Sequence, residues 1–476
     1  MNGPDYHKKE AQKPPVKLPH VFAILFCVLV IVAALTYILP AGEFSTVVDS
    51  ATGREIIDPE SYTVVGSSPV GIMDVFSAIP KGFEDASLIV ILTFCVAGTF
   101  NLITSAGLIP ALLQAISRRF STRGIVVIPL LLLILSLLDS FLGMPELSVV
   151  YIPIVLPLML GLGFDTVTAC AVVICGSAVG FTSGLANPYT VILCQQLVGL
   201  PLYSGIWLRI IVYAAFLLVT SIYVMRYAAR IHKNPQLSAC YEQDQCKRAE
   251  MTQGEGVTIA LGPRQKMAGI FAVIMFLFII GGTVAWEWGM AEMCGMFIAM
   301  GIGVGLISGL GVNGMCTKFL DGCRGIIMGA LVLGLARGIS VVMTEGNILD
   351  TIVYGLSKVI GSLPTSLTIV GVLFAVTILN FFIYSGSGKA ALIVPIISPL
   401  ADALGITQQT AILAYQFGDG LSNTIYPTHA SYMATLAIAD LPWQKWMKFQ
   451  TPLFGIWFVM ASLFLIIAQM IQYGPF

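Results

Sequence analysis

The chain has 476 residues, of which 57% are hydrophobic and only 10% are charged. Its mean hydropathy is +0.90 and its formal net charge is −1. Soluble domains carry about 25% charged residues, so the composition excludes a soluble globular protein and indicates an integral membrane protein. The near-neutral charge and the lack of a Lys/Arg-rich stripe argue against a nucleic-acid partner. Ten scattered cysteines without metal-ligand spacing predict no disulfide framework, metal centre or cofactor.

The first half of the membrane region, residues 20–228, contains apolar stretches that are separated by polar breaks. Each stretch is about as long as one bilayer crossing. In order, we expect a crossing at 21–39, an external loop at 41–80, a crossing at 87–107, a two-legged hairpin at 124–163, an interrupted helix at 166–199 and a crossing at 206–225. Residues 1–19 are polar and basic, and they form a tail before the first crossing.

A charged stretch from Arg226 to Lys266 divides the chain, and we assign 229–266 as a linker. Basic residues outnumber acidic residues there and lie close to the ends of the crossings, so the positive-inside rule places the linker in the cytoplasm. The second half, 267–476, repeats the order of the first. Its segments are crossings at 267–286, 291–311 and 325–344, an amphipathic segment at 345–362, a hairpin at 365–404, an interrupted helix at 407–439 and a last crossing at 450–472.

The two halves share positions of proline and glycine. A shift of 242 residues maps the first of the following sets onto the second: Pro153, Ile154, Pro157 and Gly163; Pro395, Ile396, Pro399 and Gly405. Counting crossings from a cytoplasmic N-terminus makes 87–107 and its equivalent 325–344 run in opposite directions. The predicted fold is therefore an all-α polytopic membrane protein with nine transmembrane helices and two opposed re-entrant hairpins in two inverted repeats, and the C-terminus is external.

Polar islands interrupt the apolar sequence at the hairpin tips, 140–148 and 384–389, and at the helix breaks, 181–190 and 417–429. Irregular backbone at membrane depth is tolerated only where protein or water surrounds it. In inverted-repeat transporters, half-helix ends and freed carbonyl groups meet near the midplane and bind a solute or an ion. We therefore expect these four elements to converge.

The chain resembles the YfcC family in the segments SGSGKAALIVPIISPLADALG, YQFGDGLSNTIYPT, LPWQKWMKF and GMPELSVVYIPIVLPL. That family belongs to the C4-dicarboxylate anaerobic carrier-like group of the ion transporter superfamily and is linked by its naming to basic amino acid antiport. The resemblance covers almost the entire chain. It implies a secondary carrier of the bacterial cytoplasmic (inner) membrane, of the elevator type, with a scaffold domain and a moving transport domain. Na⁺ coupling and a homodimer are further expectations from the resemblance.

Candidate substrate-binding and ion-binding residues lie in the tips and breaks. They are Gly143, Glu146, Ser183, Asn187, Ser385, Ser387, Lys389, Asp419, Ser422, Asn423, Thr424 and Thr428. The neutral oxygens of Asn187, Ser422 and Asn423 suit Na⁺ or a substrate, or else they cap the helix ends. The glycines of the tips allow sharp turns.

Three candidate residues carry charge, and an ionisable group at this depth is a functional hypothesis by default. Lys389 can hold a substrate carboxylate, while Glu146 or Asp419 can hold an amino group, Na⁺ or a proton. Alternatively, these residues pair with each other, as buried charges usually do. Two acids against one base favour a zwitterionic or cationic solute over a dianion. His429 is either a proton relay or a packing residue.

The favoured function is secondary active transport of a small charged organic solute, an amino acid or a C4-dicarboxylate-like carboxylate, coupled to Na⁺ or H⁺ or driven by exchange. No ATP-binding G-x-x-x-x-G-K-[ST] motif occurs. One alternative is an intramembrane aspartyl protease that uses Asp139 and Asp419, since two adjacent carboxyls can activate water. Another is a channel, which needs a continuous polar stripe through the membrane. The sequence favours a carrier, which is not an enzyme.

Overall fold

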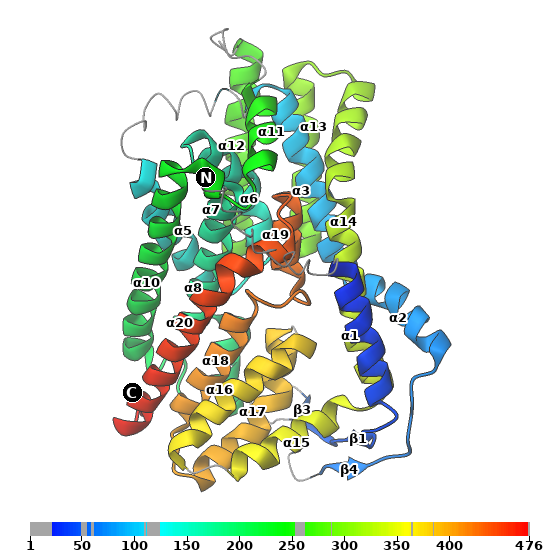
Figure 1. Cartoon of the computed structure of the whole chain (residues 1–476), viewed down its shortest axis with the longest axis vertical. Coiled ribbons are helices and arrows are strands. Elements are labelled where there is room, and N and C mark those ends of the chain that lie inside the picture. Colours follow the sequence, from blue (N-terminus) through cyan, green and yellow to red (C-terminus); the bar gives the residue numbers. More distant parts are fainter. Residues whose placement is uncertain are drawn as a thin grey trace, which may run out of the picture.

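The computed structural model describes residues 21–48, 55–58, 61–108, 111, 124–252, 262–286, 288–362, 365–383 and 385–474 (Figure 1). Seven of its helical segments are long and apolar enough to cross a bilayer, and the chain is a multi-pass membrane protein. They are Ser87–Ser105, Gly124–Leu142, Thr166–Leu197, Ile206–Lys233, Met290–Ser308, Ile326–Glu345 and Trp443–Met470. The expected number of nine crossings stays a prediction. The expected tail at 1–19 lies outside the described residues.

The segment expected to be an external loop, 41–80, is more ordered than the sequence suggested. It contains two antiparallel strand pairs, β1 (Gly42–Glu43) with β4 (Thr63–Val64) and β2 (Thr46–Val48) with β3 (Glu55–Ile57). It ends in an amphipathic helix, α2 (Ile72–Asp85). The loop prediction was wrong for α2, because Pro80 and several charged residues conceal a helix that buries only Ala78 and Gly82.

Helices α2 and α3 (Ser87–Ser105) pack along α14 (Val312–Glu345) in the antiparallel sense. A Cβ at Gly82 would lie 2.4 Å from the backbone of Gly334 and Gly338, and a Cβ at Gly322 would lie 2.5 Å from the Ala97 carbonyl oxygen. A shift of 240 residues maps 72–105 onto 312–345, so the two close contacts are near equivalents of each other. The segments predicted to be equivalent therefore run in opposite directions.

Two helix pairs lie at the positions of the expected hairpins. The first is α5 (Val127–Leu142) with α6 (Leu147–Gly161), preceded by the short helix η1 (Gly124–Val126), and the second is α16 (Thr365–Phe382) with α17 (Gly386–Ala403). Both second legs contain two prolines, at Pro153 and Pro157 in α6 and at Pro395 and Pro399 in α17. The paired prolines predicted from the repeat thus lie at matching places in two helix-turn-helix units.

The two interrupted helices are broken where glycine, proline and asparagine occur in the sequence. The first comprises α7 (Thr166–Cys170), the π-helix η2 (Ala171–Cys175), α8 (Gly176–Ser183), the π-helix η3 (Pro188–Ile192) and α9 (Leu193–Leu197). The second comprises α18 (Gln408–Ser422) and α19 (Ala430–Ile438). Gly184, with φ +50°, ends α8 in the left-handed conformation that glycine adopts at least cost.

The remaining helices flank these units. They are α1 (Val21–Leu35), α10 (Ile206–Lys233), η4 (Pro235–Leu237), α11 (Tyr241–Thr252), α12 (Pro263–Ala285), α13 (Met290–Ser308), α15 (Leu349–Gly361) and α20 (Trp443–Met470). The linker contains the helix α11, which is fixed to both halves. Its Asp244 accepts a 3.1 Å bond from the Thr166 N–H, and its Lys247 donates 2.7 Å to the Ala439 carbonyl.

The helices form two packed groups (Figure 1). One group, here called the site bundle, contains α5–α10 and α16–α20. The other, the flanking bundle, contains α1–α3 and α12–α14. The two groups meet mainly where α6 and α19 of the site bundle pack on α3 and α14. The tips and breaks all belong to the site bundle.

The close approach of α14 to α3 generates a stability prediction. We expect Gly322→Ala to lower the free energy of unfolding by about 1–3 kcal/mol, because the new methyl group overpacks against Ala97. Gly314→Ala, on the same helix but with nothing within 4 Å of its Cβ, should be neutral or slightly stabilising. Thermal unfolding of the detergent-purified variants measures both. Equal melting temperatures for the two variants would contradict the observed packing.

Candidate functional site

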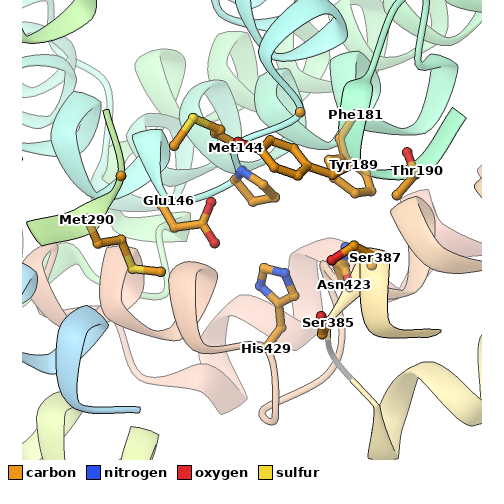
Figure 2. Close-up of a pocket in the computed structure, with 14 residues that line it drawn as sticks. Met144, Glu146, Phe181, Tyr189, Thr190, Met290, Ser385, Ser387, Asn423 and His429 are labelled. Carbon is orange, nitrogen blue, oxygen red and sulfur yellow. The ribbon is translucent and has the colours of Figure 1, made fainter. Parts of the chain in front are cut away.

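A cavity of about 250 Å³ lies where all four predicted elements meet (Figure 2). Its lining comes from the two tips, the two breaks and the start of α13. The residues are Gly143, Met144, Pro145 and Glu146 of the first tip, Phe181, Tyr189 and Thr190 around the first break, Ser385, Gly386 and Ser387 of the second tip, Asn423 and His429 of the second break, and Gly289 and Met290 at the start of α13. The predicted convergence of tips and breaks is therefore present in the structure. Hereafter this cavity is called the central pocket.

The first tip and the first break are joined through backbone. The Ala186 N–H donates 3.1 Å to the carbonyl oxygen of Ser140. Gly143, with φ +62°, turns the chain at the tip, and a Cβ there would lie 2.2 Å from Asn187 Oδ1. Only glycine fits this position, because it needs both the left-handed conformation and the close approach. Gly143 therefore positions the first tip, as the sequence predicted for a tip glycine.

Asn187 is fully buried and caps the helix that follows the first break. Its Oδ1 accepts bonds from the N–H groups of Tyr189 at 3.0 Å and Thr190 at 3.3 Å. Its Nδ2 and the Thr190 hydroxyl have no hydrogen-bond partner within the described residues. Of the two roles predicted for this side chain, helix capping is the one seen in the structure. Its Nδ2 group is left as an unused hydrogen-bond donor close to Gly143, which lines the pocket.

The second tip is held by a buried ion pair. Lys389 Nζ lies 2.7 Å from Asp419 Oδ1, and both side chains are inaccessible to solvent. The same ammonium group donates to the Ile383 carbonyl oxygen at 3.1 Å and to Asn380 Oδ1. All three donors of the Lys389 ammonium thus have acceptors. For Lys389 and Asp419 the structure thus contains the pairing that was one of the two alternatives, and Lys389 does not line the pocket.

Asn380 of α16 connects the second helix pair to the second break. It was not among the residues predicted from the sequence. Its Nδ2 lies 3.0 Å from the Asp419 carbonyl, 2.7 Å from Ser422 Oγ and 2.6 Å from Asn423 Oδ1. The signal that could have identified it is its isolation, because it is the only amide side chain in the apolar leg 365–382. Ser422 and Asn423 therefore serve as acceptors for Asn380, and the Na⁺ site expected near Asn187, Ser422 and Asn423 stays a prediction.

The two breaks are also joined to each other, where α8 crosses α18. Gln416 Nε2 donates to the Phe181 carbonyl oxygen. A Cβ at Gly420 would lie 2.4 Å from Thr182 Oγ1, so the absence of a side chain there permits the crossing. The two halves thus contribute to one polar centre.

Three candidate hydroxyl residues do not line the pocket. Ser183 donates to the carbonyls of Val179 and Gly180 within its own helix. Thr424 donates to the Leu421 carbonyl and accepts from Gln450 of α20. Thr428 is buried, but it does not line the pocket. These three hydroxyls were predicted as ligands because their sequence neighbours are polar, which does not specify their direction.

The lining of the pocket has an acidic character. Figure 2 shows the carboxylate of Glu146 and the imidazole of His429 pointing into the same space from opposite sides, with Ser387 and Asn423 beside them. Among the described residues no Lys or Arg lines the pocket. A carboxylate with neutral oxygens attracts a positively charged group.

Asp139 and Asp419, the two acids of the protease alternative, have different neighbours. Asp419 is engaged with Lys389, whereas Asp139 is in electrostatic contact with Glu146. Two carboxyls must be adjacent to share a proton and activate water. The pairing of Asp419 with Lys389 does not favour the protease alternative, which stays a prediction.

Comparison with known proteins places the chain in a family. Residues 18–470 match the family model described as C4-dicarboxylate anaerobic carrier. The chain belongs to this carrier family. A relative from Escherichia coli K12, named "Putative basic amino acid antiporter YfcC", is 31% identical over 96% of this chain and 97% of its own length. The resemblance to the YfcC family is thereby confirmed.

A further relative and two solved structures are also similar to the chain. An uncharacterized protein of Haemophilus influenzae Rd is 24% identical over 96% of this chain and 98% of its own length. The Alcanivorax borkumensis YdaH transporter is 15% identical with a TM-score of 0.37, covering 94% of this chain and 98% of that one. Neisseria gonorrhoeae MtrF, an antimetabolite efflux pump, is 15% identical with a TM-score of 0.43, covering 96% of each chain.

The buried ion pair of this carrier-family protein can be tested by charge removal. We expect Lys389→Gln and Asp419→Asn each to lower the free energy of unfolding by about 3–5 kcal/mol, because each leaves a buried charge uncompensated. The double variant should recover most of the loss. Thermal unfolding in detergent measures this cycle, with Lys318→Gln, an exposed residue of α14, as control. Single variants that melt with the wild type would show that the pair does not hold the tip.

Proposed function

We propose that the protein is a secondary active transporter of the bacterial inner membrane that exchanges a small cationic amino acid across the bilayer. The observation that carries this proposal is the lining of the central pocket, where Glu146 is the one carboxylate among the described residues. Lys389 lies outside that lining and is neutralised by Asp419. The volume of about 250 Å³ is below the roughly 300–1,000 Å³ of pockets for drug-sized ligands, as suits a small solute. The name of the Escherichia coli relative points to the same class.

The groups around the pocket offer complementary ends for such a solute. Glu146 binds the positively charged end through charge-assisted hydrogen bonds. The first turn of α17, where Ser385 caps the helix and Ser387 lines the pocket, presents free N–H groups and the positive end of the helix dipole to a carboxylate. Asn423 and Thr190 contribute neutral contacts between these ends. Coupling to Na⁺ or H⁺ drives the exchange.

The transport mechanism follows from the two helix bundles. In this proposal the site bundle is the moving domain of an elevator, the flanking bundle is its scaffold, and the two helix pairs are re-entrant hairpins of two inverted repeats. The antiparallel packing of α2 and α3 on α14 supports the inversion. The positive-inside rule supports a cytoplasmic linker and N-terminus and an external C-terminus. A homodimer is part of the same proposal.

Transport of a C4-dicarboxylate is the second candidate, because the family description names that substrate class. A dianion would need cationic partners, and the described pocket residues include no Lys or Arg. The pocket chemistry therefore ranks a cationic solute first.

Counterflow in proteoliposomes tests the function. Vesicles loaded with unlabelled L-arginine, L-lysine, L-ornithine, L-glutamate or succinate are diluted into the labelled form of the same compound. We expect rapid exchange of at least one of the three basic amino acids, and little exchange of succinate. Exchange of succinate alone would overturn the cationic-solute assignment. Label equilibration through an open pore, without dependence on internal solute, would favour the channel alternative.

The role of Glu146 has a sharper test. Glu146→Gln removes the charge but keeps the shape, and we expect it to reduce the kcat/KM for the basic amino acid by about tenfold or more, because hydrogen bonds to charged groups contribute about 1.5–3 kcal/mol. Glu84→Gln, an exposed position of α2, is the matched control and should transport at the wild-type rate. Unchanged kinetics in Glu146→Gln would remove this residue from the binding site.

A further inference from the structure

Asp139 is a buried carboxyl group to which the transport proposal has assigned no role. It lies in the last turn of α5, is 0% exposed, and does not line the central pocket. Neither of its oxygens makes a hydrogen bond of normal geometry within the described residues, although the Ser177 hydroxyl and the Met144 N–H lie near them. It takes part in no ion pair there. A buried carboxylate without a cationic partner is costly, which favours its neutral form.

The surroundings of Asp139 are hydroxyl groups from several helices. Ser177 of α8 faces the carboxyl, and its hydroxyl lies 3.2 Å from that of Tyr432 of α19. Tyr151 of α6 lies within electrostatic range, and its hydroxyl is also without a partner in the described chain. On the α10 side, Tyr213 bonds Ser136, one turn before Asp139, at 2.9 Å. None of these neighbours carries a positive charge.

The titratable groups around Asp139 are therefore one carboxyl group and several weakly acidic hydroxyl and thiol groups. Glu146 of the first tip is close enough to act electrostatically on Asp139. Asp139 in turn acts on the hydroxyl groups of Tyr151 and Tyr432. The adjoining π-helix η2 contributes Cys175, and α8 contributes no ionisable side chain. Of these groups, tyrosine and cysteine ordinarily lose their protons only at alkaline pH, so near neutral pH the two carboxyl groups are the candidates for proton exchange.

We propose that Asp139 is the binding site of the coupling proton, a second site distinct from the central pocket. The proposal rests on the transport function proposed above. A proton fits better than a metal ion, because hard cations require several oxygen ligands, and the described residues contain no group of three or more His, Cys, Asp or Glu side chains that could hold a metal ion. The hydroxyl groups of Ser177 and Tyr151 are able to accept a bond from the protonated form and to donate one to the ionised form.

Glu146 links the two sites, because it lines the pocket and also acts on Asp139. A cationic solute at Glu146 and a proton on Asp139 repel each other through the low-dielectric protein. Entry of the cation therefore favours breakage of the O–H bond of Asp139, and the proton leaves to water in the pocket. The net charge of the site is the same before and after this step. The coupling is thus an exchange of one solute cation for one proton.

The variant Asp139→Asn tests this inference, since its carboxamide mimics the protonated form and cannot release a proton. We expect it to retain at least half of the wild-type counterflow of the basic amino acid. With a pH difference of one unit across the membrane, we expect wild type to accumulate the solute about tenfold, the limit for one-to-one exchange, and the variant to show no accumulation. Asp402→Asn, an exposed position at the end of α17, should behave as wild type. Accumulation by Asp139→Asn at the wild-type level would overturn the proposal.

A measurement without solute separates this inference from the transport function. Infrared difference spectra between acidic and alkaline pH, on purified protein, report the carbonyl stretch of protonated carboxyl groups. We expect one such band to be present in wild type and Asp402→Asn and absent in Asp139→Asn. This result supports the proton site even where no amino acid is transported or where the variant has lost counterflow. Identical spectra in all three proteins would refute it.

Discussion

The ion pair between Lys389 and Asp419 is the interaction on which the geometry of the pocket depends. It joins the first turn of α17 to α18, and Asn380 adds α16 through bonds to both partners. A buried charge is stable only while its partner stays in place, so the three helices hold fixed positions. Ser385 and Asn423 are thereby presented to the pocket from a rigid support.

Many features of the fold could be predicted from the sequence because glycine and proline act on their own backbone. Gly143 and Gly184 end helices where the sequence suggested interruptions, and the proline pairs of α6 and α17 lie at matching positions. These are local effects, which one stretch of sequence contains in full. The order of tips and breaks, and their convergence, followed from them together with the repeat.

The features that could not be predicted depend on partners far away in the chain. Helix α2 buries Gly82 against Gly334 and Gly338, and no pattern within 72–85 announces that contact. Asn380 acquires its role from residues 39 to 43 positions later. The ion-pair partner of Lys389 could not be predicted either, because Glu146 and Asp419 were both expected where the tips and breaks meet. Side-chain direction and partner choice are tertiary properties, so sequence periodicity does not determine them.

The two halves share a backbone plan but differ in charge, and this difference separates their tasks. A shift of 242 residues maps Lys389 onto Leu147, which is buried at the start of α6. The first tip therefore lacks the ammonium group that neutralises Asp419 in the second, and Asp139 lies near that tip without a cation among the described residues. A buried carboxylate paired with a cation keeps its charge and fixes a structure, whereas burial without a cation favours the neutral form. One Lys-to-Leu difference between matched positions thus separates a tip that is held by a buried ion pair from a tip that is not.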